Sequence, residues 1–353
     1  MIGAVNVVAG LALAAAASCA GPVGAPRAPD LPPPVGMPLD PVPATWVTLA
    51  PVPERRTEVS AATDGQYVYL AGGFGPPVGE ERATAPRTLW RYDPDADDWA
   101  AVTELPEGVH HAPFQYHDGR LYILGGFRET TFEPVANVRI YDLATGEWSE
   151  GALMPTPRGA AGWAMLNGRI HVIGGTAAED AVDLTRDRMT DDRSVNTHEA
   201  YDPATDSWHA LAPMPTPRNH LGAAAADGRI HAVLGRADGD FTMAVHEIYD
   251  PAADSWTGGP AVPTGRSGVA VLEHRGYVYA FGGERLDEPD ERTFDDAERY
   301  DPRTDRWELL PPMPTARHGL GAAAIGSSIY VVSGGPGPGF TFGDANERLD
   351  PGG

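Results

Sequence analysis

The sequence predicts an all-β fold, a six-bladed propeller closed into a ring. Three observations support this prediction. A tryptophan recurs six times at intervals of 48 to 60 residues, a period typical of propeller blades. The 42 glycines and 35 prolines among 353 residues favour short strands joined by turns over helices. A hydrophobic content of 42% is sufficient for a core, which excludes wholesale disorder.

Each unit carries four strand signals in a fixed order. In the third unit, a run of small residues reaches the turn Asn167–Gly168, and the next strand ends at the glycine pair Gly174–Gly175. A further strand precedes the turn Asp202–Pro203 and is followed by a strand containing Trp208. Four short antiparallel strands in about 50 residues form one propeller blade. The recurring tryptophans are Trp46, Trp99, Trp148, Trp208, Trp256 and Trp307; the other glycine pairs are Gly72–Gly73, Gly125–Gly126, Gly282–Gly283 and Gly334–Gly335, with Leu234–Gly235 in the fourth unit.

The two ends of the repeat region are complementary. The last unit stops after Leu349–Asp350 without a tryptophan strand, and the first unit begins with an unpartnered one, residues 45–49. We expect this N-terminal strand to complete the sixth blade, because closure removes an exposed sheet edge.

The first 44 residues are expected to lie outside the propeller. Residues 1–19 have the apolar run of a signal peptide and resemble a bacterial lipoprotein signal that ends at Cys19, the single cysteine and candidate lipidation site. Ordinary secretion and a misplaced start codon are the alternatives. Residues 20–44 contain nine prolines and predict an extended linker, followed by the propeller over residues 45–353. The expected location is the bacterial cell envelope, outside the cytoplasm.

The repeating glycine pair, the following tyrosine and the tryptophan at fixed offsets resemble the kelch repeat. The resemblance covers residues 45–353 and implies a kelch β-propeller. In blade number and export the chain also resembles the periplasmic N-acetylneuraminate epimerases, which are sialic-acid mutarotases. Intracellular kelch adaptors bind acidic peptides, but they carry additional domains that this sequence lacks.

Charge and composition exclude several functions. The net charge of −23 argues against binding to nucleic acid, and contact with a membrane is expected only through a lipid anchor. All 26 basic residues are arginines, which excludes lysine chemistry. The kelch resemblance also includes the copper galactose oxidases, whose cofactor needs a cysteine cross-linked to a tyrosine. The single cysteine, Cys19, lies in the signal segment, so this chemistry is excluded. The sequence predicts no metal site and no cofactor.

Candidate ligand-binding residues lie on the loop-rich face, where each outer strand leads into the next inner strand. An arginine recurs there, and these arginines would form an incomplete cationic ring suited to carboxylate or phosphate. The alternative is an internal role, in which the arginines pair with Glu199, Glu247, Glu298 and Glu347. The recurring arginines are Arg56, Arg158, Arg218, Arg266 and Arg317, and Val109 occupies the second position.

Residues that do not recur are better site candidates, since a recurring residue usually serves the repeat. They are expected to converge on the channel mouth, and they are His110, His111, Arg128, Asn219, His220, Arg236, Glu284 and His318. The long charged loop over residues 176–197 is interpreted either as a lid or partner-binding loop or as a solvated insertion.

The sequence thus predicts an extracytoplasmic binding module, monomeric, that recognises an acidic peptide, protein or carbohydrate on the loop-rich face. The alternative is a carbohydrate enzyme such as a sialic-acid mutarotase, and whether the protein is an enzyme stays open. A paired acid and base at the channel mouth, within reach of one small ligand, would favour the enzyme.

Overall fold

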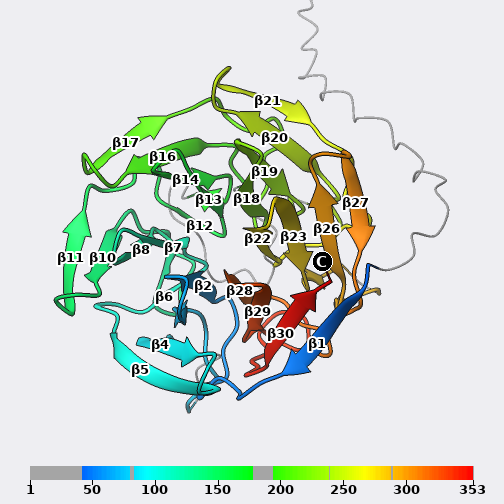
Figure 1. Ribbon diagram of the computed structural model, residues 1–353. Coiled ribbons are helices and arrows are strands. Elements are labelled where there is room, and N and C mark those ends of the chain that lie inside the picture. Colours follow the sequence, from blue (N-terminus) through cyan, green and yellow to red (C-terminus); the bar gives the residue numbers. More distant parts are fainter. Residues whose placement is uncertain (1–41, 80–82, 178–193, 238, 288, 353) are drawn as a thin grey trace, which may run out of the picture. The chain divides into compact units, whose positions relative to one another are not determined.

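A computed structural model describes residues 42–79, 83–177, 194–237, 239–287 and 289–352 (Figure 1). The chain divides into Met1–Pro38 and Leu39–Gly353, and all described residues belong to the second unit. The predicted signal segment with Cys19, most of the predicted linker, and residues 178–193 of the long loop lie outside the described residues. In the described part of the chain no helix is long and apolar enough to span a membrane.

The described residues form an all-β ring of six four-stranded antiparallel sheets, which confirms the predicted fold (Figure 1). From the channel outward, the first blade contains β2 (Ser60–Thr63), β3 (Val68–Ala71), β4 (Thr88–Asp93) and β5 (Asp98–Glu104), and the second contains β7 (Phe114–His117), β8 (Arg120–Leu124), β10 (Val138–Asp142) and β11 (Glu147–Gly151). The third blade contains β13 (Gly162–Leu166), β14 (Arg169–Ile173), β16 (His198–Asp202) and β17 (Ser207–Ala210), and the fourth contains β18 (Gly222–Ala226), β19 (Arg229–Val233), β20 (His246–Asp250) and β21 (Ser255–Gly258). The fifth blade contains β22 (Ala270–His274), β23 (Tyr277–Phe281), β26 (Ala297–Asp301) and β27 (Arg306–Leu309), and the sixth contains β28 (Gly321–Ile325), β29 (Ser328–Val332), β30 (Asn346–Pro351) and β1 (Ala44–Thr48). Three short ribbons join them, β6 (Val109–His110) with β9 (Phe127–Arg128), β12 (Arg158–Gly159) with β15 (Thr176–Ala177), and β24 (Glu284–Arg285) with β25 (Arg292–Thr293).

The N-terminal strand β1 completes the sixth blade as predicted. It pairs antiparallel with β30, and Trp46 lies opposite Leu349. The strand begins one residue earlier than expected, at Ala44. Trp46 packs edge-on against Phe281 of the fifth blade and donates its indole N–H to the carbonyl oxygen of Pro311, 2.9 Å away. The ring is therefore closed by a strand from one end of the chain and three from the other.

Small residues let the inner strands approach one another around the channel. A Cβ atom on Gly222 of β18 would lie 2.1 Å from a side-chain carbon of Val271 in β22, so no larger residue fits there. At the glycine pair of the third unit, Gly174 has a φ of +62° and a Cβ atom would lie 2.7 Å from the carbonyl oxygen of Arg218. Both a left-handed backbone and a close approach therefore require glycine.

The prediction of the sixth glycine pair is wrong by one residue. In the other units the two residues of the pair have φ values near +60° and then between +91° and +119°. In the sixth unit these values belong to Ser333, with a φ of +59°, and Gly334, with a φ of +101°. The equivalent pair is therefore Ser333–Gly334. The left-handed first position is occupied by a non-glycine residue here, as it is by Leu234 in the fourth unit.

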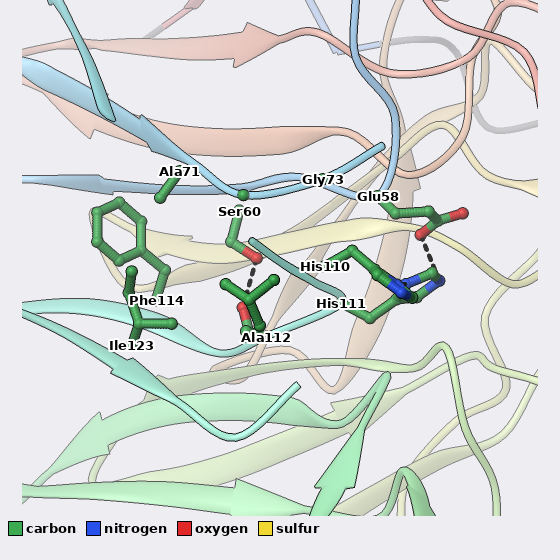
Figure 2. Close-up of a pocket in the computed structure, with 11 residues that line it drawn as sticks. Glu58, Ser60, Ala71, Gly73, His110, His111, Ala112, Phe114 and Ile123 are labelled. Carbon is green, nitrogen blue, oxygen red and sulfur yellow. Dashed lines mark hydrogen bonds and ion pairs between the residues drawn. The ribbon is translucent and has the colours of Figure 1, made fainter. Parts of the chain in front are cut away.

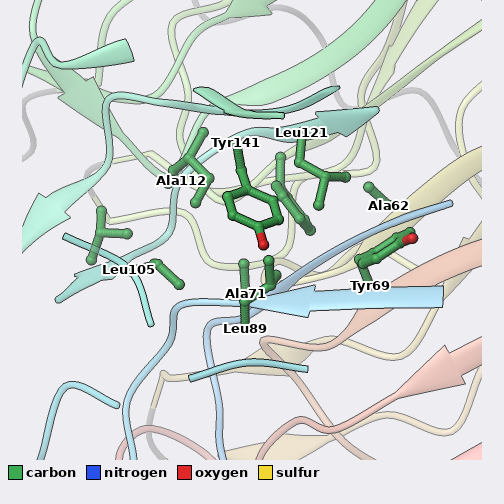
Figure 3. Packing of buried hydrophobic residues seen from close by; sticks show 11 residues of the cluster. Ala62, Tyr69, Ala71, Leu89, Leu105, Ala112, Leu121 and Tyr141 are labelled. Atoms are coloured by element: carbon green, nitrogen blue, oxygen red, sulfur yellow. The ribbon is translucent and has the colours of Figure 1, made fainter. Parts of the chain in front are cut away.

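Hydrophobic packing lies between neighbouring blades. The cluster between the first two blades joins Tyr69 and Leu89 to Leu121 and Tyr141 (Figure 3). The repeated tryptophans add hydrogen bonds across the blade boundary, as in the third blade, where Trp208 donates to the carbonyl oxygen of Ala152 at 2.9 Å. These contacts confirm that the repeated aromatic residues pack between blades.

Two buried histidine pairs lie in blades three and four. His171 Nδ1 is 2.9 Å from His198 Nε2, and His231 Nδ1 is 2.9 Å from His246 Nε2. Burial lowers the pKa of His171 and His231 to about 4 and that of His198 and His246 to about 3. The unfolded chain, whose histidines titrate near 6.5, then binds more protons than the folded chain. This contribution to stability is complete above pH 6.5 and falls as the pH drops toward the folded pKa values.

We therefore expect a smaller pH dependence when one pair is replaced. Between pH 7 and pH 5, the wild-type free energy of unfolding should fall by roughly 3 kcal/mol more than that of a His231→Gln/His246→Gln variant. Urea unfolding at the two pH values measures this difference. His117→Gln, on the partly exposed strand β7, is the control and should behave as wild type. Equal pH dependence in the double variant would show that the pair does not stay neutral in the folded protein.

Candidate functional site

Six equivalent residues form a ring around the propeller axis, which we call the axial ring. Each lies where an outer strand leads into the next inner strand, and each has a left-handed backbone with φ between +50° and +68°. In five of the six, the amide N–H donates to the carbonyl oxygen of the equivalent residue in the preceding blade, at 2.8–3.2 Å. At the sixth position Val59, which follows Glu58, donates to Gly319 at 3.1 Å and closes the circle. The members are Glu58, His111, Ala160, His220, Gly268 and Gly319.

The axial ring lies at a central cavity. The cavity has about 630 Å³ of space not filled by atoms, part of it open to solvent. Glu58, His111 and His220 supply its ionisable side chains, and its other walls are small or apolar, with Trp163 as the one aromatic residue among them. A smaller cavity between the first two blades is also lined by Glu58 and His111 (Figure 2).

Glu58 and His111 form an acid–base pair at this cavity. Oε2 of Glu58 lies 3.0 Å from Nε2 of His111, and the two side chains point toward one another in Figure 2. His110 donates from Nε2 to the carbonyl oxygen of Thr131, 2.6 Å away. Its Nδ1 therefore accepts from Nδ1 of His111. His111 thus turns Nε2 toward Glu58, and the hydrogen bond from its Nδ1 to His110 fixes the orientation of its ring.

His318 brings the sixth blade to the same carboxylate. Its Nε2 lies 3.4 Å from Oε1 of Glu58 and 3.4 Å from Oε2 of Glu284, and its Nδ1 donates to the carbonyl oxygen of Gly335 at 3.2 Å. Burial opposes a charge on this ring, but the carboxylates of Glu284 and Glu58 raise the pKa of His318 to about 9. Although burial alone would raise the pKa of Glu58, His111 and His318 hold it well below its usual value.

Arg236 and His220 complete the group. Arg236 donates from Nη1 to Glu284 at 2.8 Å and from Nη2 to Nε2 of His220 at 2.9 Å. Nε2 of His220 is therefore the acceptor, and Nδ1 carries the proton toward the side-chain oxygen of Asn219. Burial first, and then the Arg236 charge, lowers the pKa of His220 well below its usual value. We call Glu58, His111, His220, Arg236, Glu284 and His318 the axial cluster.

The structure thus brings together most of the non-recurring candidates. His110, His111, Asn219, His220, Arg236, Glu284 and His318 all lie in or directly beside the axial cluster. Arg128 does not, because its side chain is 43% exposed and pairs with Glu107 at 3.1 Å. Glu58 was not among the predicted site residues. It stands two residues after Arg56, as His111 and His220 follow their own repeat positions, so alignment of the units would have found it.

The recurring arginines do not form a cationic ring at the mouth, and the internal alternative is correct for four of them. All five are fully buried. In the last four blades the guanidinium group binds the predicted glutamate of its own blade and a backbone carbonyl. These pairs are Arg158–Glu199 at 2.5 Å, Arg218–Glu247 at 2.5 Å, Arg266–Glu298 at 2.7 Å and Arg317–Glu347 at 2.5 Å.

The first two blades satisfy the same need differently. Arg56 pairs with Glu54, since Trp90 occupies the position of the glutamate and donates to Glu54 at 3.2 Å. In the second blade, Arg139 occupies the glutamate position and pairs with Glu107. The arginines are therefore part of the scaffold that holds the axial ring.

An aromatic wall stands beside the axial cluster. The Phe74 ring lies 3.9 Å from His110, 6.0 Å from Phe132 and 5.3 Å from Phe340, centroid to centroid. Phe340 is 41% exposed. The site therefore offers an apolar contact surface next to a charged one.

Comparison with known proteins identifies the repeat. The family model described as the Kelch motif matches residues 55–106, 110–155, 157–215 and 265–314. The chain belongs to the kelch-repeat family. Kelch propellers commonly serve as protein-interaction modules.

Individual kelch relatives are distant. Kelch-like protein terF of Aspergillus terreus is 27% identical over 88% of this chain and 69% of its own length. The chain covers only 36% of human Kelch-like protein 34, at 28% identity over 82% of this chain, and only 27% of Xenopus tropicalis Kelch-like protein 40, at 27% identity over 52% of this chain. A solved structure titled "Structure of YjhT" matches with a TM-score of 0.70 and 17% identity, over 84% of this chain and 95% of that one, and supports the fold.

Proposed function

We propose that this kelch propeller is an extracytoplasmic binding module that takes a small, hydroxyl-rich ligand of the carbohydrate class at the axial cluster. The observation that carries the proposal is the Glu58–His111 pair, 3.0 Å apart at the solvent-open central cavity. A carboxylate and an imidazole at one end of a concave site provide the few convergent polar groups that small-ligand sites use.

Burial favours a small ligand over a flat protein surface. The side chain of Glu58 is 11% exposed, that of His111 is 4% exposed, and that of His318 is fully buried. A protein surface would have to insert a side chain to reach them, whereas a small ligand could enter the cavity from its solvent-open side. Trp163 in the cavity wall offers an aromatic face for the apolar side of a sugar ring.

The charges that favour an acidic ligand come from the axial cluster. Four of the five recurring arginines pair with carboxylates in their own blades, and Arg56 pairs with Glu54. Their charges are therefore neutralised inside the propeller. His318, whose pKa is raised to about 9, and Arg236 lie next to the cavity. The carboxylate of an acidic sugar would share these two cations with Glu58 and Glu284.

A second candidate function is isomerisation of a sugar at its anomeric carbon. It is favoured by the same acid–base pair, because anomer exchange needs one group to take the anomeric hydroxyl proton and another to protonate the ring oxygen as the C–O bond opens. Glu58 would accept the proton and His111 would donate one. Ring closure on the other face returns both protons, so the reaction is balanced.

Thermal shift measurements on the full chain test the ligand. An acidic sugar at about 100 times its Kd should add roughly 2.7 kcal/mol and raise the melting temperature by about 4 °C. Glu58→Gln should abolish the shift, and Arg128→Ala, outside the axial cluster, should retain it. A shift with acidic peptides and none with any sugar would contradict the proposal and indicate a protein partner. If an acidic sugar binds, polarimetry then tests anomer exchange.

Export is proposed from the sequence of residues 1–19 alone. Fractionation of bacterial cells that express the full chain tests it. The protein should be found in the envelope fraction, and Cys19→Ser should release it in soluble form if the cysteine is acylated. Retention of both forms in the cytoplasm would contradict export.

A further inference from the structure

We propose that Glu58, Glu284 and His318 bind a divalent transition-metal ion beside the axial cavity, although the sequence predicted no metal site. Among the described residues, these three place one ligand atom each within 4.8 Å of one another. They come from the first, fifth and sixth blades, so the site exists only in the closed ring.

The distances fit a cation better than direct hydrogen bonds. Nε2 of His318 lies 3.4 Å from an oxygen of Glu58 and 3.4 Å from an oxygen of Glu284. A hydrogen bond between an imidazolium and a carboxylate is normally about 2.7–2.9 Å long. Two ligand atoms that are each about 2.1 Å from a tetrahedral metal ion are about 3.4 Å apart. The distances from His318 to the two carboxylates therefore match those between metal ligands, and all three ligand atoms lie within 4.8 Å of one another.

The surrounding hydrogen bonds prepare His318 as a ligand. Its Nδ1 donates to the backbone carbonyl of Gly335, so Nε2 is the atom that faces the two carboxylates and that a metal ion would bind in place of its proton. This is the arrangement in which metal-binding histidines are usually held. Glu284 is oriented in the same way, because Arg236 binds its Oε1 and the amide of Gly339 binds its Oε2 at 2.9 Å.

A second group of three, Glu58, His111 and His220, is a weaker candidate. Nε2 of His220 accepts from the Arg236 cation, and its Nδ1 faces Asn219, so neither nitrogen is available for a metal ion. His111 instead supports the proposed site by fixing the second oxygen of Glu58 at 3.0 Å.

The charge count links the metal to the ligand. Two carboxylates, Arg236 and a divalent cation carry one net positive charge together, in a buried pocket. Such a charge favours an anionic ligand on the open side of the metal. One imidazole and two carboxylates suit Zn²⁺ or Mn²⁺, and the thiolates that would favour softer metals are absent from this set.

The test measures metal in the full chain without any sugar, so its result is independent of the proposed ligand. After treatment with a chelator, the protein should bind one equivalent of Zn²⁺ or Mn²⁺ by isothermal titration calorimetry. Substitution with Co²⁺ should give the visible absorption of a low-coordinate site. His318→Gln and Glu284→Gln should each weaken the affinity at least tenfold. His117→Gln, a histidine on β7 outside the axial cluster, is the control and should bind as wild type.

Two results would overturn the proposal. One is that wild-type protein binds neither metal stoichiometrically with a Kd below about 100 µM, a value on the order of that of weak sites. The other is equal affinity in the wild type, His318→Gln and Glu284→Gln. Circular dichroism melts of each variant show that it is folded, and a rise in the wild-type melting temperature on addition of Zn²⁺ provides a second readout that needs no variant.

Discussion

Removal of residues 1–50, so that the chain begins at residue 51, is expected to lower the melting temperature by roughly 10 °C. The truncation removes β1, and with it the five paired positions along β30, the Trp46–Phe281 contact and the hydrogen bond to Pro311. Loss of this buried surface and of the ladder costs about 5 kcal/mol, and each kcal/mol shifts the melt by about 2 °C in a large domain. Strand β30 also becomes an open edge, so aggregation should increase.

A truncation that begins at residue 42 is the matched control, because it retains every contact of the described residues. Calorimetry of the two truncations and the full chain measures the effect. If the chain that begins at residue 51 melts within about 2 °C of the full chain, β1 does not close the ring in solution.

Replacement of Glu298 by leucine is expected to cost 3–5 kcal/mol of unfolding free energy. Glu298 and Arg266 are both fully buried, 2.7 Å apart, and the guanidinium also donates to the carbonyl oxygens of Thr264 and Gly282. Removing the carboxylate leaves a cation in the interior without its charged partner. Removing both charges, in Arg266→Met/Glu298→Leu, should restore most of the lost stability, since apolar side chains can fill the same space.

The exposed ion pair Arg120–Asp142 is the control for this buried pair. Arg120 lies 3.2 Å from Asp142, but its side chain is 51% exposed, so Arg120→Leu should change the free energy by less than about 1 kcal/mol. Urea unfolding of the three variants measures the differences. A cost below 1 kcal/mol for Glu298→Leu would mean that the buried pair is not part of the scaffold.

The fold was predictable because its signals are local. Turn residues such as Asn167–Gly168 and the regular tryptophans fix the strands of each blade without reference to the rest of the chain. The missing tryptophan strand at the C-terminus and the unpartnered Trp46 strand at the N-terminus indicated closure. The glutamates opposite the arginines could also be read from the repeat, because both residues recur at fixed offsets.

The candidate site was predictable only in part. His111, His220 and His318 stood out because they interrupt the repeat, and the structure places all three at the axis. Glu58 did not stand out as a single residue, and only its offset of two residues from Arg56, which His111 and His220 share at their own repeat positions, marks it. Arg128 does not join the axial cluster, because its side chain in β9 pairs with Glu107 and is 43% exposed.

The sequence by itself therefore determined the number of blades and the strand that closes the ring, and it offered the internal pairing of the arginines as one of two alternatives. Only the tertiary structure decided which side chains meet at the axis. Glu58 and His318 come from opposite ends of the repeat region, and they face one another because β1 and β30 join those ends and because left-handed backbone turns aim Glu58 inward. Such a contact depends on the closed ring as a whole, so no repeat offset or local spacing encodes it.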